Sequence, residues 1–296
     1  MISNRYDFVL FYDVENGNPN GDPDAGNMPR LDPETMHGLV SDGALKRKIR
    51  DYVYTRYSEE PGIDIFVKHG GILNNEIDRA YEGVSVAKKD GKATPTADQR
   101  QTARDFMCRT YFDVRTFGAV MSTGANAGQV RGPVQLTFSR SIDPIVPLEI
   151  SLTRVAFTDP KKAESTQSET EMGRKHLVPY ALYRAHGFVS PQLAKQTGFS
   201  EDDLAKLWTA LENMFELDRS AARGTMSSRL LCIFRHESPY GDAPAHRLFD
   251  AISVRRRPNG GTGPARSFGD YEIQIDRSKI PDQVNLETRP ELAGVS

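Results

Sequence analysis

The sequence has few cysteines and no excess of charge of one sign. Only two cysteines, Cys108 and Cys232, occur among 296 residues, and each stands in an apolar segment far from the other. This pattern predicts two buried, reduced thiols and argues against a disulfide framework or a cysteine metal site. The formal net charge at pH 7 is -2, so the overall balance does not by itself indicate a nucleic-acid-binding protein.

Long hydrophobic runs are also missing. The longest apolar run near the start, FVLFY, is far shorter than the roughly 20 residues of a membrane-spanning helix. The first residues lack the basic and apolar regions of a secretory signal. We therefore expect a cytoplasmic protein with no membrane partner.

Catalytic motifs are scarce as well. The six histidines form no paired metal-binding motif, and Ser122 does not lie in a nucleophile elbow. We expect no catalytic residue, no metal and no cofactor. One alternative stays open, in which His176 and His186 serve a ribonuclease as general acid and base.

The stretch from Asn16 to Pro29, NGNPNGDPDAGNMP, is too rich in Asn, Gly and Pro for a regular helix or a central strand. It lacks the carboxylates of a calcium loop and the lysine of a phosphate loop. A metal site for phosphodiester hydrolysis is a further alternative, with ligands from Asp13, Glu15, Asp22 and Asp24.

Basic residues gather just after this loop. Between Ala44 and Tyr57, five Lys or Arg stand against one Asp. Apolar residues recur at helical spacing from Leu45, which places Lys46, Arg47 and Arg50 off the buried stripe. We call these three residues the basic ridge and the stretch Asn16–Pro29 the Asn/Gly loop. A basic ridge beside such a loop is typical of phosphate-backbone binding, and a solvated helix face is the alternative. A second basic stretch, residues 253–266, holds four arginines and no acid.

The order of expected elements indicates an α+β fold. The pattern predicts a helix beginning either at Asp32, before Pro33, or at Ser41, and a helix over 200–217 capped by Ser200. Two polar excursions, over about 59–110 and 158–176, interrupt the sheet. The expected strands are Tyr6–Val14, Val134–Phe138, Ser151–Phe157, 177–190 and 229–237. Strand, helix and strand, repeated after an excursion, is the order of a split βαβ sheet.

Four segments together resemble a known family. They are NGNPNGDPD, LVSDGALKRKIRDYV, FDVRTFGAVMS followed by VRGPVQLTFSRSIDPI, and GRKHLVPYALYRAHGFVS. In this order they are similar to the backbone subunit of Cascade, the CRISPR RNA-guided surveillance complex, in its type I-C form. That form is called the Csd2 family and belongs to the repeat-associated mysterious protein superfamily.

The resemblance implies a single domain over residues 1–296. Its palm would have a ferredoxin-like, RNA-recognition-motif fold, with a finger insertion at 59–113 and a thumb insertion at 155–178. It would bind the CRISPR guide RNA, copies of itself in a head-to-tail filament, other Cascade subunits and, through the guide, target DNA in antiviral defence. A repeat-RNA-processing endoribonuclease of the same superfamily is the alternative.

The resemblance also implies an RNA-binding surface. The base-stacking signature of an ordinary RNA-recognition motif is missing, so Phe117 is expected in the core. Met172 would act as a wedge in the thumb. The implied RNA-binding residues are Asn18, Asn20, Ser41, Lys46, Arg47, Arg50, Arg115, Arg131, Met172, Arg174 and Lys175.

Overall fold

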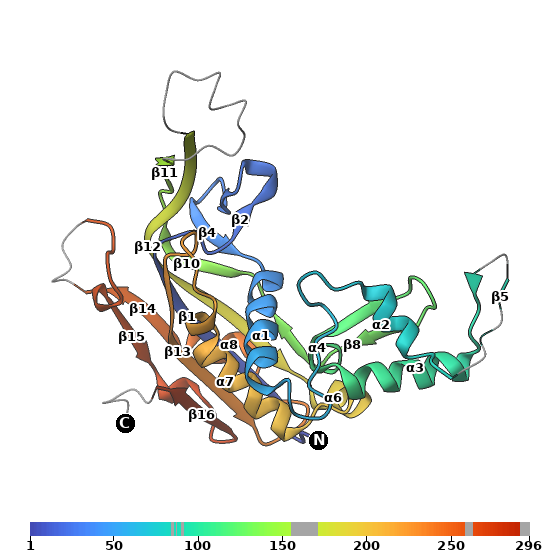
Figure 1. Cartoon of the computed structure of the whole chain (residues 1–296). Coiled ribbons are helices and arrows are strands. Elements are labelled where there is room, and N and C mark those ends of the chain that lie inside the picture. Colours follow the sequence, from blue (N-terminus) through green and yellow to red (C-terminus); the bar gives the residue numbers. More distant parts are fainter. Residues whose placement is uncertain (84–85, 87, 90–91, 155–170, 258–262, 291–296) are drawn as a thin grey trace, which may run out of the picture.

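The structure is a computed structural model that describes residues 1–296 except 84–85, 87, 90–91, 155–170, 258–262 and 291–296 (Figure 1). Its central strand, β1 (Tyr6–Gly17), is buried on both faces over most of its length. Phe8 and Tyr12 point to one face, and Val9 and Phe11 point to the other. The strand predicted over Tyr6–Val14 is confirmed.

The sheet around β1 is antiparallel throughout. β1 pairs with β12 (Glu171–Val189) along one edge and with β13 (Thr225–His236) along the other. The strand order continues as β16 (Val284–Arg289), β13, β1, β12, β10 (Ser139–Pro144) and β4 (His37–Val40). β9 (Val134–Leu136) and β11 (Leu148–Arg154) also pair with β12. Four expected strands are therefore present, with ends that differ from the predicted ones where they are described. Residues 155–157 of the predicted strand Ser151–Phe157 lie outside the described residues.

Two long helices cover one face of the sheet, and a hairpin with a short helix covers the other. α1 (Asp42–Tyr57) packs against α7 (Glu201–Leu217) over the first face, where the Trp208 ring meets Phe8 edge-on at 5.1 Å between centroids. Phe117 is buried in the same core, as expected. On the second face lie α8 (Ala245–Asp250) and the hairpin of β14 (Ile252–Arg256) and β15 (Tyr271–Ile275).

Cys108 and Cys232 are both free and buried, which confirms the expectation of two reduced thiols. Burial raises the pKa of Cys108 to about 11 and that of Cys232 to about 12. Neither thiol is activated as a nucleophile at neutral pH.

Of the two predicted helix starts, only that at Ser41 is correct. Ser41 caps α1 by accepting from the Ala44 N–H, and the helix predicted to begin at Asp32 is a turn. There, the Asp32 N–H donates to the His37 carbonyl at 2.9 Å, and Met36 adopts a φ of 57°, which no α-helix accommodates. The pairing of β4 with β10 stabilises an extended segment here more than the residues near Asp32 favour a helix.

The predicted helix over 200–217 is confirmed by α7 with Ser200 as its cap. The Ser200 hydroxyl accepts from the Asp203 N–H at 3.1 Å, and the Asp203 carboxylate accepts from the Ser200 N–H at 2.9 Å. This reciprocal pair is a capping box with Asp in the usual place of Glu.

A lobe stands beside the sheet and extends to the right in Figure 1. It holds α2 (Leu73–Arg79), α3 (Ala97–Thr110), α4 (Phe112–Phe117), β7 (Gly118–Met121), β8 (Gly128–Arg131) and the short strands β5 (Lys88–Lys89) and β6 (Lys92–Ala93). Phe66, Ile77, Met107 and Tyr111 form its own apolar cluster, which continues to Ala127. The predicted finger insertion, 59–113, overlaps this lobe, which continues beyond the predicted end through α4 to β8.

A two-stranded extension rises from the sheet at the top of Figure 1. β11 pairs with the first part of β12 from Leu148 opposite Leu177 to Arg154 opposite Glu171. Of the predicted thumb, 155–178, residues 155–170 lie outside the described residues. The remaining part belongs to β12.

A buried ion pair joins the lobe to the body. The Arg115 guanidinium in α4 donates to the Asp203 carboxylate in α7 at 2.7 Å, and also to the Gly62 carbonyl at 2.7 Å. Both charged side chains are buried. Since one partner alone would be an uncompensated buried charge, this pair constrains how α4 and α7 meet.

We predict that Arg115→Leu lowers the free energy of unfolding by about 3–5 kcal/mol, because Asp203 is left buried without its cation. Adding Asp203→Asn, which preserves the cap, should recover part of that loss. Urea denaturation of both variants measures the effect. The control is Arg109→Leu on the exposed side of α3, where we expect a change within about 0.5 kcal/mol. Equal losses at positions 109 and 115 would contradict the prediction.

Candidate nucleic-acid interface

The Asn/Gly loop is attached directly to the start of α1. The Asn20 side-chain oxygen accepts from the Ser41 N–H at 2.9 Å and from the Ser41 hydroxyl at 3.0 Å. The buried Asn18 amide donates to the Asn27 carbonyl at 2.7 Å, across the turn that holds β2 (Gly21–Asp22) and β3 (Met28–Pro29). These three predicted RNA-binding residues therefore hold the loop and the helix start in place.

The same loop packs closely against the segment that follows α7. A Cβ on Gly17 would lie 1.8 Å from the Arg223 carbonyl oxygen, so only glycine fits there. The Asn18 N–H donates to the Ala222 carbonyl at 2.8 Å. This contact brings Arg223 beside α1, a placement for which the sequence contains no local signal.

Each predicted cation of the ridge contacts a carboxylate. Lys46 pairs with Asp42 at 2.9 Å, one turn earlier on the helix. Arg47 pairs with Asp51 and, at 3.1 Å, with Asp218 at the end of α7. The Arg47 side chain remains 43% exposed.

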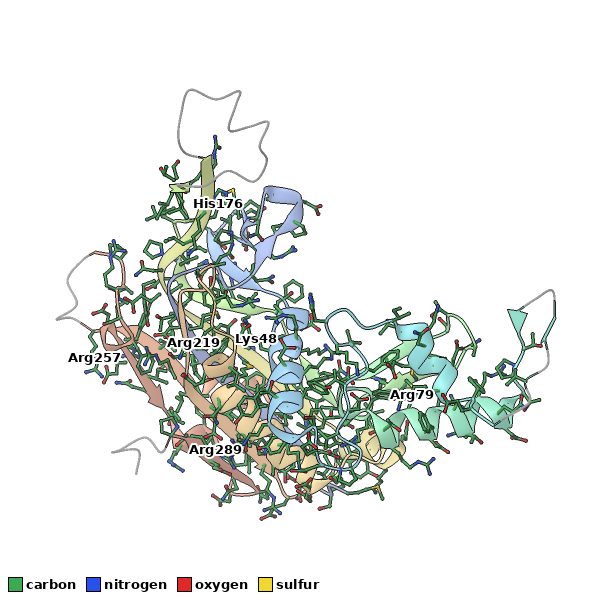
Figure 2. The ribbon with its side chains drawn as sticks, in the orientation of Figure 1. Lys48, Arg79, His176, Arg219, Arg257 and Arg289 are labelled. Atoms are coloured by element: carbon green, nitrogen blue, oxygen red, sulfur yellow. The ribbon has the colours of Figure 1, made fainter. Side chains whose placement is uncertain are left out.

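The Asp218 carboxylate contacts cations from α1 and from the segment that follows α7. Arg223 donates to it at 2.9 Å, and the ammonium of the fully buried Lys48 also contacts it. Figure 2 shows the position of Lys48 on α1. Burial lowers the pKa of Lys48 to about 8, against the opposing effect of Asp218. Burial favours a higher pKa for Asp218, but Lys48, Arg47 and Arg223 outweigh it and hold that pKa below its usual value. Three cations thus surround one ionised carboxylate.

Arg50 is placed differently from Lys46 and Arg47. Its guanidinium donates to the buried Asp113 carboxylate at 2.8 Å, and its side chain is only 12% exposed. Asp113 also accepts from the backbone N–H groups of Phe66 and Val67. Arg50 therefore connects α1 to the lobe.

The remaining predicted residues are not brought together with the ridge. Arg115 is buried against Asp203, so a phosphate would reach it only after that pair had opened. Arg131 is exposed on β8 in the lobe. Arg174, on the β11–β12 extension, pairs with Glu149 at 2.9 Å, and the adjacent Lys175 points to the other face of the strand. Met172 lies on β12, and its side chain is outside the described residues.

The sequence model of the family described as CRISPR-associated protein Cas7 matches residues 4–276. The chain belongs to the CRISPR-associated Cas7 family. It is similar to the CRISPR-associated protein Cas7 of Haloferax volcanii, with 28% identity over 232 residues, 71% of this chain and 65% of that protein. The match thus spans less than two thirds of the curated relative's length.

The fold agrees with this family. The structure is similar, with a TM-score of 0.51 and 16% identity over 78% of each chain, to a chain of a solved structure described as a CRISPR RNA-guided surveillance complex, pre-nicking. Among the described residues, no helix is long and apolar enough to cross a membrane.

The two histidines of the ribonuclease alternative lie far apart in this member of the Cas7 family. His176 stands on the β11–β12 extension, at the top of Figure 2, ten residues before His186 on the same strand. At about 3.3 Å per residue their separation is roughly 30 Å, too far to serve one reacting bond. The His186 ring stacks on Phe249 at 4.3 Å, and burial lowers its pKa to about 4.

The carboxylates considered as metal ligands are also not assembled. Asp13 accepts from the Arg229 guanidinium at 2.8 Å and from the Tyr180 hydroxyl at 2.9 Å. In the described part of the chain, no group of three or more His, Cys, Asp or Glu side chains is placed to hold a metal ion.

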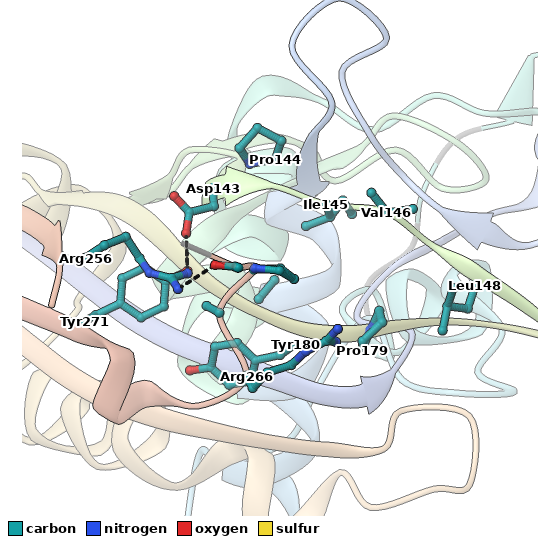
Figure 3. Close-up of a pocket in the computed structure, with 14 residues that line it drawn as sticks. Asp143, Pro144, Ile145, Val146, Leu148, Pro179, Tyr180, Arg256, Arg266 and Tyr271 are labelled. Atoms are coloured by element: carbon teal, nitrogen blue, oxygen red, sulfur yellow. Dashed lines mark hydrogen bonds and ion pairs between the residues drawn. The ribbon is translucent and has the colours of Figure 1, made fainter. Parts of the chain in front are cut away.

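A cavity of about 590 Å³ lies at the base of the extension, on the sheet face opposite α1 (Figure 3). Asp143 forms its polar side, accepting from the Tyr271 hydroxyl at 2.7 Å and from the Arg256 guanidinium at 3.2 Å. Val146 and Leu148 line the other side. Arg256 comes from the arginine-rich stretch at 253–266, so at least one arginine of that stretch makes a contact within the fold.

We predict that Lys48 makes stability rise with pH between about 8 and 10.5. The folded pKa is about 8 and the usual value is 10.5, so in this interval the unfolded chain binds the proton that the folded chain has lost. Lys48→Met removes this difference, while Asp218 keeps Arg47 and Arg223. From pH 8 to 9.5, the wild type should gain roughly 1–2 kcal/mol relative to the variant in urea denaturation. Titration of both cysteines affects the two proteins equally. A constant difference between them would contradict the assignment.

Proposed function

We propose that this chain is a guide-RNA-binding backbone subunit of a type I-C CRISPR surveillance complex. Membership of the Cas7 family, over residues 4–276, supports the general role. Resemblance of the four quoted segments to the type I-C form supports the subtype. The subunit performs no catalytic step, needs no cofactor and works in the cytoplasm.

The palm of this subunit is a ferredoxin-like, RNA-recognition-motif sheet. Its support is the order β13, β1, β12, β10, in which α1 follows β1 and α7 follows β12. A split βαβ unit has this arrangement. The lobe of α2 and α3 serves as the fingers, and the β11–β12 extension is the base of the thumb.

The guide backbone binds at the corner where the Asn/Gly loop meets α1. The observation that carries this proposal is that Arg47, Lys48 and Arg223 share the single carboxylate of Asp218. An RNA phosphate placed there would be attracted by cations that one carboxylate does not neutralise, although Asp51 offsets part of the charge on Arg47.

The exposure of the carboxylate partner separates the cations that can take part from those that cannot, since Asp42 is 34% exposed and Asp113 only 1%. The pairs of Lys46 with Asp42 and of Arg47 with Asp51 are partly exposed, and such pairs are worth about 0–1 kcal/mol. Exchanging their carboxylates for phosphates therefore costs little. The buried pair of Arg50 with Asp113 stays in place and keeps the fingers attached.

Assembly follows from binding along the guide. Copies of the chain stack head to tail, other Cascade subunits close the ends, and target DNA pairs with the guide while the protein holds the backbone. In this assembly Met172, Arg174 and Lys175 of the extension contact the guide bound by a neighbouring copy.

We predict that Lys46→Ala with Arg47→Ala weakens binding of a short RNA by roughly tenfold or more at 0.1 M salt. Each lost phosphate contact on a single strand reduces the log-log salt slope by about 0.7, so the slope should fall by about 1.4. Fluorescence anisotropy of the full chain with a labelled RNA, at several salt concentrations, gives both values.

The matched control is Arg56→Ala, which removes a cation from the exposed last turn of the same helix. It should leave the slope unchanged. If the double variant keeps the wild-type slope, or if Arg56→Ala lowers it equally, the ridge is not the guide site. Co-purification with the neighbouring subunits tests the wider role, since we expect a discrete RNA of uniform length.

A further inference from the structure

A second polar cavity lies where the lobe meets the body. It measures about 340 Å³ and is bordered by one side of α3, by β8 and by the end of α6 (Pro191–Thr197). In Figure 1, α6 lies near the lower end of α1, whereas the β2–β3 loop and the helix start lie at the upper end. The cavity is therefore separate from the proposed guide corner.

Hydrogen-bonding side chains dominate its lining. They are Gln101, Arg104, Asp105, Gln129, Arg131, Gln196 and Thr197. Asp105 is the single acid among them, and its carboxylate accepts from the Gln101 amide at 2.8 Å. Two arginines against one carboxylate leave the cavity with a net positive charge, which favours an anion.

Two residues that line this cavity each have a buried polar atom without a hydrogen-bond partner among the described residues. These atoms are the hydroxyl oxygen of Thr197, which is 4% exposed, and Nε of Arg104. Another guanidinium nitrogen of Arg104 does donate to the Gln101 side chain, at 2.6 Å. An unmade hydrogen bond at a buried polar atom is costly, so a site of this kind is ordinarily filled by water or by a ligand.

We propose that this cavity binds a phosphate group. Phosphate oxygens accept from the Thr197 hydroxyl and from the planar guanidinium groups of Arg104 and Arg131, whose fork geometry suits them. Resting on the proposed function, the phosphate belongs to the backbone of the target DNA strand, since the guide occupies the other end of α1. Arg131, predicted to line the guide groove, then contacts target instead.

Inorganic phosphate is the first probe, with the full chain alone. Phosphate should raise the melting temperature of the wild type above a chloride control of equal ionic strength. Thr197→Val should abolish most of this shift. Without phosphate the variant should be as stable as the wild type or more so, because the hydroxyl it removes has no partner. If the Thr197 hydroxyl had only a structural role, Thr197→Val would lower the melting temperature without phosphate and leave the phosphate-induced shift unchanged. No shift in the wild type, or an equal shift in the variant, overturns the phosphate site.

Guide-loaded protein with single-stranded target DNA is the second arm. Thr197→Val and Arg104→Gln should each weaken target binding roughly threefold to tenfold, with unchanged affinity for the guide. The matched control is Arg109→Gln, on the same helix but outside the cavity. This variant should change neither the affinity for target DNA nor the affinity for the guide.

The outcomes separate the possible sources of the phosphate. If guide affinity falls and target affinity does not, the site serves the guide and the target assignment is wrong. If only the response to inorganic phosphate is lost, the ligand is a free phosphate compound and the nucleic-acid assignment is wrong. Failure of the wild type to bind any guide would instead refute the proposed function, while the phosphate arm would still decide the cavity.

Discussion

The whole structure depends on the burial of β1 on both faces and its pairing along both edges. A buried charge in this position needs a partner, and the two buried acids of the strand both have one. Asp7 contacts Arg5 and His236, and Asp13 contacts Arg229 and Tyr180. The position at which the strand ends depends on the segments packed beside it. It does so at Gly17, whose missing side chain lets the Arg223 carbonyl approach. The Asn/Gly loop begins there, so its place beside α1 is a consequence of sheet geometry.

Three buried or half-buried aspartates then fix what surrounds the sheet. Asp113 pairs with Arg50 of α1, Asp203 pairs with Arg115 of the lobe, and Asp218 pairs with the buried Lys48 of α1. Each acid lies far along the chain from its cation. The contacts join α1, α7 and the lobe into one unit, and they determine which cations remain available for a polyanion. The net charge of -2 therefore does not describe the local charge of the surface, which depends on these pairs.

Local signals in the sequence predicted the parts of the fold that local energetics decide. The nearly continuous apolar run of β1, the cap at Ser41 and the capping box of Ser200 and Asp203 are all signals within a few residues, and all three features are present. The helix start at Asp32 failed because pairing between β4 and β10, about a hundred residues apart, has the larger effect. The candidate site was limited in the same way. Sequence spacing placed Lys46, Arg47 and Arg50 on one helix, but it contained no information on Asp113, Asp218 or Arg223.

The difference between exposed and buried ion pairs gives the molecule two kinds of basic residue. A buried pair is expensive to break, because either partner left alone is an uncompensated charge in a poorly solvated site. Arg50 and Arg115 are of this kind, and they serve the shape of the protein whatever is bound to it. An exposed pair contributes little, so its carboxylate can be replaced by a phosphate with almost no loss. The pairs of Lys46 with Asp42 and of Arg47 with Asp51 are of this second kind, because their carboxylates are 34% and 47% exposed. The proposed function requires a protein that is nearly neutral overall and still binds a polyanion, and this division meets both requirements. On α1, Lys48 and Arg50 then serve folding, while Lys46 and Arg47 serve the proposed binding.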